Sequence, residues 1–278
     1  MQRLRLFGTD QYLRADDVHL YGLPLPKLRI DGQRAQRGVR GEPSEGLEEE
    51  PGEGKVVSVG ITCTGADERT DLERLSAMRC EVGILVRWES PFKRGHAQRY
   101  PCLEWIKDAM DALPNVALHF CGLEAKSALF HSNIYDGIVS KAQRIQINGD
   151  VNLEYVAQEC EMYPEKKWIT QWREDTISSV MFLTHSNHQL LVDSSGGRGI
   201  LPGEWKRPCT FKRVGYAGGL NAPQLKSEFS RIAEIAGDDF WIDAEHWLRE
   251  DNWFNLDHVE RFIDVFMKSC ETHGLKWE

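Results

Sequence analysis

Residues 190–199 read LLVDSSGGRG, and residues 214–221 read VGYAGGLN. Each stretch begins with a short apolar run typical of a buried strand and ends in a glycine-rich turn. Glycines let backbone N–H groups approach an anion closely, and a carboxyl group at a strand end can exchange protons. The two stretches together indicate parallel strands whose carboxyl ends carry catalytic and anion-binding groups.

The same pattern repeats through most of the chain. From Lys55 onward, short apolar runs alternate with segments of helical spacing, which predicts a (β/α)8 TIM barrel of the α/β class. Eight strand runs favour the closed barrel over a doubly wound open sheet, because closure leaves no edge strands. The predicted strands cover 56–62, 82–88, 116–121, 144–148, 168–172, 189–193, 213–217 and 240–243. The predicted helices cover 71–78, 101–113, 152–163, 221–236 and 257–270.

Residues 1–54 have a different composition. They are rich in Arg, Gly, Pro and acidic residues, and they have little apolar periodicity. The sequence therefore predicts two parts, a poorly structured and flexible N-terminal extension over 1–54 and the barrel over 55–278.

The composition limits the classes of function. The formal net charge of −9 argues against a nucleic-acid partner. No apolar run has the length of a membrane span and the Met1 end has no signal-peptide core, so we expect a cytoplasmic protein without a membrane partner. The seven cysteines are odd in number and form no CxxC pair, which indicates reduced thiols. We expect a small anionic metabolite as partner, no cofactor, no metal, and a monomer or homodimer.

Active residues of a (β/α)8 barrel lie at the carboxyl ends of its strands. Asp193 is the strongest catalytic candidate because a partly buried carboxyl group there can donate a proton; the alternative is that it only anchors the glycine loop. Cys63, after the first strand, and Cys121, on the third, are candidate bases, with burial as inert small residues as the alternative.

Polar side chains at the other strand ends are candidates for binding substrate. An arginine can hold a carboxylate or phosphate, and polar residues that alternate with apolar ones point into the barrel. Two acids that share a face of the eighth strand could form a second acid–base pair. These candidates are Arg87, Arg99, His119, Asn148, Asp243 and Glu245.

The two glycine motifs resemble those of the phosphoribosylanthranilate isomerase family, single-domain (β/α)8 barrels of tryptophan biosynthesis. The family's sixth strand ends in Asp, followed by Gly-Gly-Thr-Gly and a Trp, which are similar to Asp193, residues 196–199 and Trp205. The family's Ala-Gly-Gly-Leu-Asn-Pro is similar to residues 217–223, and its loop after strand two is similar to residues 98–101. The resemblance runs from about Lys55 to the end of the chain.

The resemblance implies an Amadori rearrangement, in which an aminoaldose phosphate becomes an aminoketose by general acid–base catalysis. It implies that Asp193 is the acid and that Arg99 meets the carboxylate of the anthranilate. The turns that would hold the phosphate contain Gly197, Arg198, Gly199, Gly218 and Gly219.

Two positions depart from the family pattern. The family's catalytic Cys aligns with Val59, so Cys63 serves as the base only if the register shifts by four residues. The eighth-strand motif Asp-Val-Ser-Ser-Gly is here DAEHW at 243–247, where Glu245 would repel a phosphate. We therefore expect a sugar-phosphate isomerase with an altered substrate. The alternative is a non-catalytic or repurposed barrel that binds an anionic metabolite or a partner protein. A third hypothesis is an enzyme that uses Asp193, Asp243 and Glu245 as metal ligands.

Overall fold

The computed structural model describes residues 4–5, 12–13, 58–88, 99–173, 183–193 and 195–278. The chain divides into two units, Met1–Val56 and Val57–Glu278. In the first unit the described residues form an antiparallel pair, β1 (Leu4–Arg5) with β2 (Tyr12–Leu13). Apart from these two short strands, residues 1–54, for which the sequence predicts flexibility, lie outside the described part of the chain.

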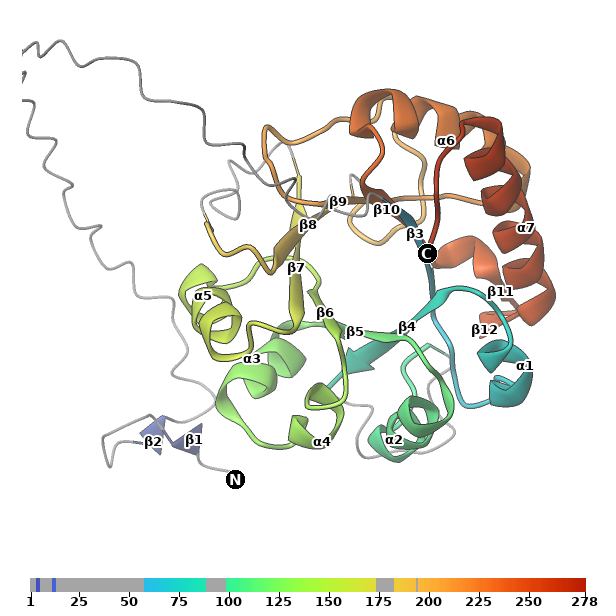
Figure 1. Ribbon diagram of the computed structural model, residues 1–278. Coiled ribbons are helices and arrows are strands. Elements are labelled where there is room, and N and C mark those ends of the chain that lie inside the picture. The colour runs from blue at the N-terminus through green and yellow to red at the C-terminus, as the bar shows by residue number, and fades with distance from the viewer. Residues whose placement is uncertain (1–3, 6–11, 14–57, 89–98, 174–182, 194) are drawn as a thin grey trace, which may run out of the picture. The chain divides into compact units, whose positions relative to one another are not determined.

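Eight parallel strands of the second unit close into a barrel, which confirms the predicted (β/α)8 fold (Figure 1). Each strand pairs with its neighbour in sequence, and the last strand pairs with the first. The strands are β3 (Val59–Thr64), β4 (Glu81–Arg87), β5 (Val116–Cys121), β6 (Arg144–Ile147), β7 (Lys167–Trp172), β8 (His188–Asp193), β9 (Val214–Ala217) and β10 (Phe240–Ala244).

Helices surround this ring (Figure 1). They are α1 (Leu72–Ser76), α2 (Leu103–Ala112), α3 (Leu123–His131), α4 (Asp136–Val139), α5 (Leu153–Met162), α6 (Ala222–Ala236) and α7 (Leu256–Thr272). The described residues between β8 and β9 contain no helix, in keeping with the two prolines of that link.

Side-chain hydrogen bonds cap the first turn of several helices at the positions where the sequence predicts helix starts. Asp71 accepts from the backbone N–H of Arg74 at the start of α1, and Asn152 accepts from Glu154 at the start of α5. Asn221 does the same before α6. These bonds satisfy backbone donors that have no partner within the helix.

The main core lies between the strands and the helices. Outward-facing strand residues such as Ile84, Phe120 and Trp168 are fully buried there. Phe229 of α6 packs on Phe240 of β10 with ring centroids 5.7 Å apart. Because side chains alternate along a strand, the apolar residues of one face point outward into this core. The residues of the other face, which include the polar ones, point into the barrel.

A β-hairpin follows the last barrel strand. After the short 3-10 helix His246–Leu248, β11 (Arg249–Glu250) pairs with β12 (Trp253–Phe254), and the two turn residues between them have positive φ. The buried carboxylate of Asp67 accepts the backbone N–H of Phe254 at 2.8 Å. The hairpin is thereby tied to the loop after β3, at the same end of the barrel as the site described next.

Candidate active site at the barrel mouth

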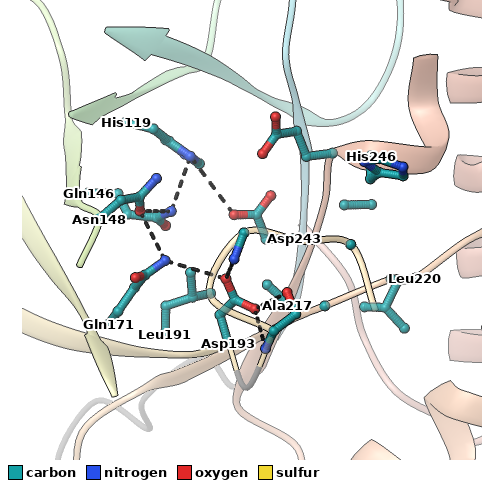
Figure 2. Close-up of a pocket in the computed structure, with 17 residues that line it drawn as sticks. His119, Gln146, Asn148, Gln171, Leu191, Asp193, Ala217, Leu220, Asp243 and His246 are labelled. Carbon is teal, nitrogen blue, oxygen red and sulfur yellow. Dashed lines mark hydrogen bonds and ion pairs between the residues drawn. The ribbon is translucent and has the colours of Figure 1, made fainter. Parts of the chain in front are cut away.

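A pocket opens at the carboxyl ends of the strands, the end at which barrel enzymes carry their active sites. Seventeen residues line it (Figure 2). They come from strands β5 to β10 and from the loops that follow β6, β8, β9 and β10. The site candidates among them are His119, Asn148, Asp193, Gly197, Gly199, Gly218, Gly219, Asp243 and Glu245.

An apolar layer lies beneath the pocket. Trp241, Leu191 and Ile169 form a buried cluster inside the barrel, separate from the main core. A Cβ atom at Gly215 would overlap the indole ring of Trp241, so only glycine leaves room for the ring. Below the indole ring, the guanidinium of Arg144 stacks 4.5 Å from the ring centroid. The mouth is therefore separated from the polar residues at the other end of the barrel.

Asp193 anchors the glycine loop that follows it. Its Oδ1 accepts the backbone N–H of Ser195 at 3.0 Å and the Ser195 hydroxyl at 2.7 Å. Its Oδ2 accepts the N–H of Gly197 at 2.8 Å. These bonds correspond to the anchoring role that the sequence left open. A catalytic role for Asp193 remains a proposal, because the same bonds occupy both carboxylate oxygens.

The two glycine turns touch each other. A Cβ atom at Gly219 would overlap the backbone of residues 200–201, and one at Gly199 would overlap the ring of His246. Both glycines have positive φ, 67° and 66°. Glycine is thus needed for close packing of the loops, and the N–H of Gly197 is already bonded to Asp193. A phosphate role for these turns stays a prediction.

Asp243 is buried in the pocket wall, with an exposed fraction of 6%. Its Oδ1 accepts the hydroxyl of Thr64 at 2.7 Å. The pKa of Asp243 is raised to about 7, chiefly by burial and also by the charges of Glu245 and Glu81, against the opposing effects of the Thr64 hydrogen bond and the charge of Arg144. A carboxyl group with this pKa is present in both protonation states at neutral pH.

A row of amide side chains joins Asp193 to His119 across the mouth (Figure 2). Gln171 contacts Asp193 and Asn148, Asn148 contacts Gln146, and Gln146 contacts His119. Burial lowers the pKa of His119 to about 3, and the charge of Arg144 lowers it too. His119 is therefore a neutral imidazole at physiological pH.

Arg99 and Glu245 pair with each other. The Nε of Arg99 donates to Oε1 of Glu245 at 2.5 Å, and both side chains are partly buried. The expected carboxylate-binding arginine thus holds a carboxylate of its own chain. Arg87, which is exposed at the end of β4, lies over the ring of Tyr100 with 5.3 Å to the centroid. Neither arginine lines the pocket.

The two candidate cysteines lie in different places. Cys63 packs in the main core outside the barrel, and its hydrogen bond with Cys80 and its burial raise its pKa well above the ordinary value. Cys63 is therefore not part of the site. Cys121 is on the inner face of β5, where Asn148 donates to its Sγ at 3.2 Å, but burial raises its pKa to about 11. A thiol with that pKa is a poor base at neutral pH.

The electrostatics of the pocket differ from those of an anion site. Its lining includes the three acids Asp193, Asp243 and Glu245, and none of the lining residues is a lysine or an arginine. Arg198 is exposed, outside the lining, and donates to the carbonyl of Ser195 at 2.7 Å. No phosphate-pairing cation therefore faces the pocket from among its lining residues.

In the described ranges, no three His, Cys, Asp or Glu side chains are placed to hold a metal ion, so the metal hypothesis gains no support. None of the helices in the described part of the chain combines the length and the apolar composition needed to span a bilayer.

Some residues of the site were not selected from the sequence. Gln171 occupies an inner position of a predicted strand, and this alternation could have identified it. Thr64 lies beyond the predicted end of the first strand, and its partner Asp243 is 179 residues away. His246, against Gly199, begins the short 3-10 helix that follows the last predicted strand, and this helix has no sequence signal.

Solved structures of phosphoribosylanthranilate isomerases have the fold of this barrel. The enzyme from Thermus thermophilus matches with a TM-score of 0.54 and 14% identity, over 75% of this chain and 98% of its own. The enzyme from Pyrococcus furiosus matches with 0.52 and 16%, over 76% and 99%. TrpF from Jonesia denitrificans matches with 0.57 and 12%, over 76% and 98%. No family model and no curated protein matches the sequence. At these identities the likeness establishes the fold alone.

Proposed function

We propose that the barrel mouth is an acid–base site that isomerises a sugar-derived carbonyl compound, with Asp243 as the group that transfers the proton. The observation that carries the proposal is the position of Asp243, a buried carboxyl group in the pocket wall whose pKa is about 7. General acid–base catalysis is most efficient when the pKa of the group lies near the working pH. The isomerase fold of the neighbours supports the same class of reaction by analogy.

The reaction needs one group that can both accept and return a proton. In an aldose-to-ketose rearrangement, ionised Asp243 removes the hydrogen of C2 as a proton. The electron pair of that C–H bond forms the C1–C2 double bond of an enediolate, whose negative charge lies on the former carbonyl oxygen. The proton of the C2 hydroxyl passes to that oxygen, Asp243 returns its proton to C1, and the C2 oxygen becomes the carbonyl. No oxidant or cofactor is consumed, because the atoms and electrons balance within the substrate.

The lining favours a hydroxyl-rich substrate without a strong negative charge. The amides of Gln146, Asn148 and Gln171 can all bond sugar hydroxyl groups. A phosphate would face carboxyl groups and would depend on backbone N–H groups for binding. We therefore propose an unphosphorylated sugar-type substrate and treat its phosphorylated counterpart as the competing case.

The test is turnover of matched compounds by the full chain. Ribose, ribose 5-phosphate and phosphoribosylanthranilate are incubated with the protein, and ketose formation is followed by NMR. We expect conversion of the unphosphorylated compound and a loss of at least about 100-fold in Asp243→Asn. Asp238→Asn, a change at an exposed acid, is the matched control and keeps full activity. Conversion of none of the three, or full activity of Asp243→Asn, rejects the proposal.

A second function, binding without turnover, is favoured by two observations. Asp193 is occupied by its loop, and Arg99 is occupied by Glu245. A ligand of the native state raises the unfolding temperature even when it is not converted. Stabilisation by a sugar or sugar phosphate with no product formed would assign the barrel to this second class.

A further inference from the structure

His119 is placed at the pocket wall with one ring nitrogen bonded and the other open. Its Nδ1 lies 3.1 Å from Nε2 of Gln146 and 3.9 Å from Oδ2 of Asp243, the second distance being too long for a hydrogen bond. Among the described residues, none bonds its Nε2, and His119 is part of the pocket lining. The tautomer of this imidazole decides whether the open nitrogen donates or accepts a hydrogen bond.

The backbone determines the orientation of the first amide in the row. The N–H of Gly149 donates to Gln171 at 2.7 Å, and because a backbone N–H can only donate, the atom that it meets is the carbonyl Oε1. The other atom of that amide is therefore the nitrogen. It donates to Oδ1 of Asn148 and to Oδ2 of Asp193, each at 3.4 Å.

The donors and acceptors of the next two amides are fixed in the same way, as far as His119. If the amide of Asn148 were reversed, its NH2 group would face the NH2 group of Gln171. The oxygen of Asn148 therefore faces Gln171, and its nitrogen faces the sulfur of Cys121. Gln146 meets the Asn148 oxygen at 3.0 Å and must do so with its nitrogen. The second hydrogen of that nitrogen points to Nδ1 of His119, which is then an acceptor. The proton of the neutral ring lies on Nε2.

We propose that His119 is a neutral hydrogen-bond donor whose Nε2–H binds the substrate carbonyl oxygen, and that Gln146, Asn148 and Gln171 are positioning residues that fix this tautomer. The inference rests on the proposed function, because it supplies the group that stabilises the oxyanion as Asp243 removes the proton. A fixed donor at a developing negative charge needs no proton loss of its own. The low pKa of His119, due to burial, keeps the ring neutral over the working range of pH.

The tautomer can be measured without a substrate. The full chain is labelled with 15N-histidine, long-range 1H–15N NMR spectra are recorded, and His119→Gln identifies the His119 signals. We expect an unprotonated Nδ1 and a protonated Nε2. A protonated Nδ1 in the native protein overturns the inference whatever the activity is. Lack of turnover with a correct tautomer instead rejects the proposed function, so the two failures are distinguishable.

Gln146→Glu tests the positioning role, since it places an acceptor opposite Nδ1. We expect the proton to move to Nδ1 and kcat to fall by about 100-fold, with little change in KM. Gln143→Glu adds the same carboxylate at the exposed start of β6 and leaves the tautomer as it was. An unchanged tautomer in Gln146→Glu overturns the assignment of Nδ1 of His119 as a hydrogen-bond acceptor from Gln146. If that variant does not fold, Gln171→Leu replaces it, and a mixture of both tautomers is expected.

The contact itself is tested by titration with D-ribulose. We expect the Nε2–H proton of His119 to shift downfield as the ketose binds, because a hydrogen bond to the carbonyl forms. A His119 signal that stays in place, whether or not other pocket signals move, overturns the contact.

Discussion

Asp243→Asn is predicted to stabilise the protein above neutral pH and to have little effect in acid. The native carboxyl group is buried, and its pKa is about 7 where an ordinary aspartate has 3.8. Between these values the folded protein holds a proton that the unfolded chain has lost. Its contribution to stability is present below the unfolded pKa and is lost as the pH rises through the folded pKa.

The size of this effect follows from the two pKa values. A change from 3.8 to about 7 corresponds to about 4 kcal/mol at 1.36 kcal/mol for each pH unit. Asparagine does not titrate and keeps an oxygen that can accept the Thr64 hydroxyl. We therefore expect the variant to gain about 2–4 kcal/mol over the native protein between pH 4 and pH 8.

The assay is urea unfolding of both proteins at several pH values from 4 to 8. The free energy of unfolding is compared at each pH, so that effects common to both proteins drop out. Asp238→Asn, which removes a carboxylate at an exposed position, is the control. A difference for Asp243→Asn that is flat with pH, or that falls as the pH rises, would refute the reasoning.

Two other changes have defined outcomes. Thr64→Val removes the hydroxyl that donates to Asp243, and we expect the pKa of that carboxyl to rise by about one pH unit or more, measured by 13C NMR titration. Thr62→Val, on the same strand face, serves as its control, and an equal rise there would contradict the prediction. Gly215→Ala places a methyl group into the indole ring beneath the pocket, and should lower the free energy of unfolding by about 1–3 kcal/mol. Gly203→Ala, where the added carbon meets open space, should change it little.

The fold was predictable because strand alternation is a local property. Arg144, Gln146 and Asn148 alternate with Ile145 and Ile147, and the structure places the polar set inside the barrel and the isoleucines outside. The β-hairpin after the last strand was not predicted, since its strands have only two residues each. Elements that short have no periodicity to detect.

The site was predictable only in part, because its chemistry depends on contacts across the barrel. The strand-end rule selected Asp193, Asp243 and His119, and the structure brings these three residues together in one pocket. It could not foresee that Arg99 would be paired by Glu245, since the two are 146 residues apart. Nor could it distinguish an acid whose carboxylate is hydrogen-bonded to a loop from an acid whose carboxyl group can titrate. That difference depends on how many hydrogen-bond donors the folded chain brings to each carboxylate.

The indole layer under the pocket has a consequence for isotope labelling. Trp241, Leu191 and Ile169 close the barrel below Asp243, so a hydrogen that this acid removes from a bound compound can reach bulk water only through the mouth. A compound that fills the mouth blocks that route. Deuterium placed on the carbon that loses its hydrogen would then be returned to the neighbouring carbon and retained in the product instead of being washed out into the solvent.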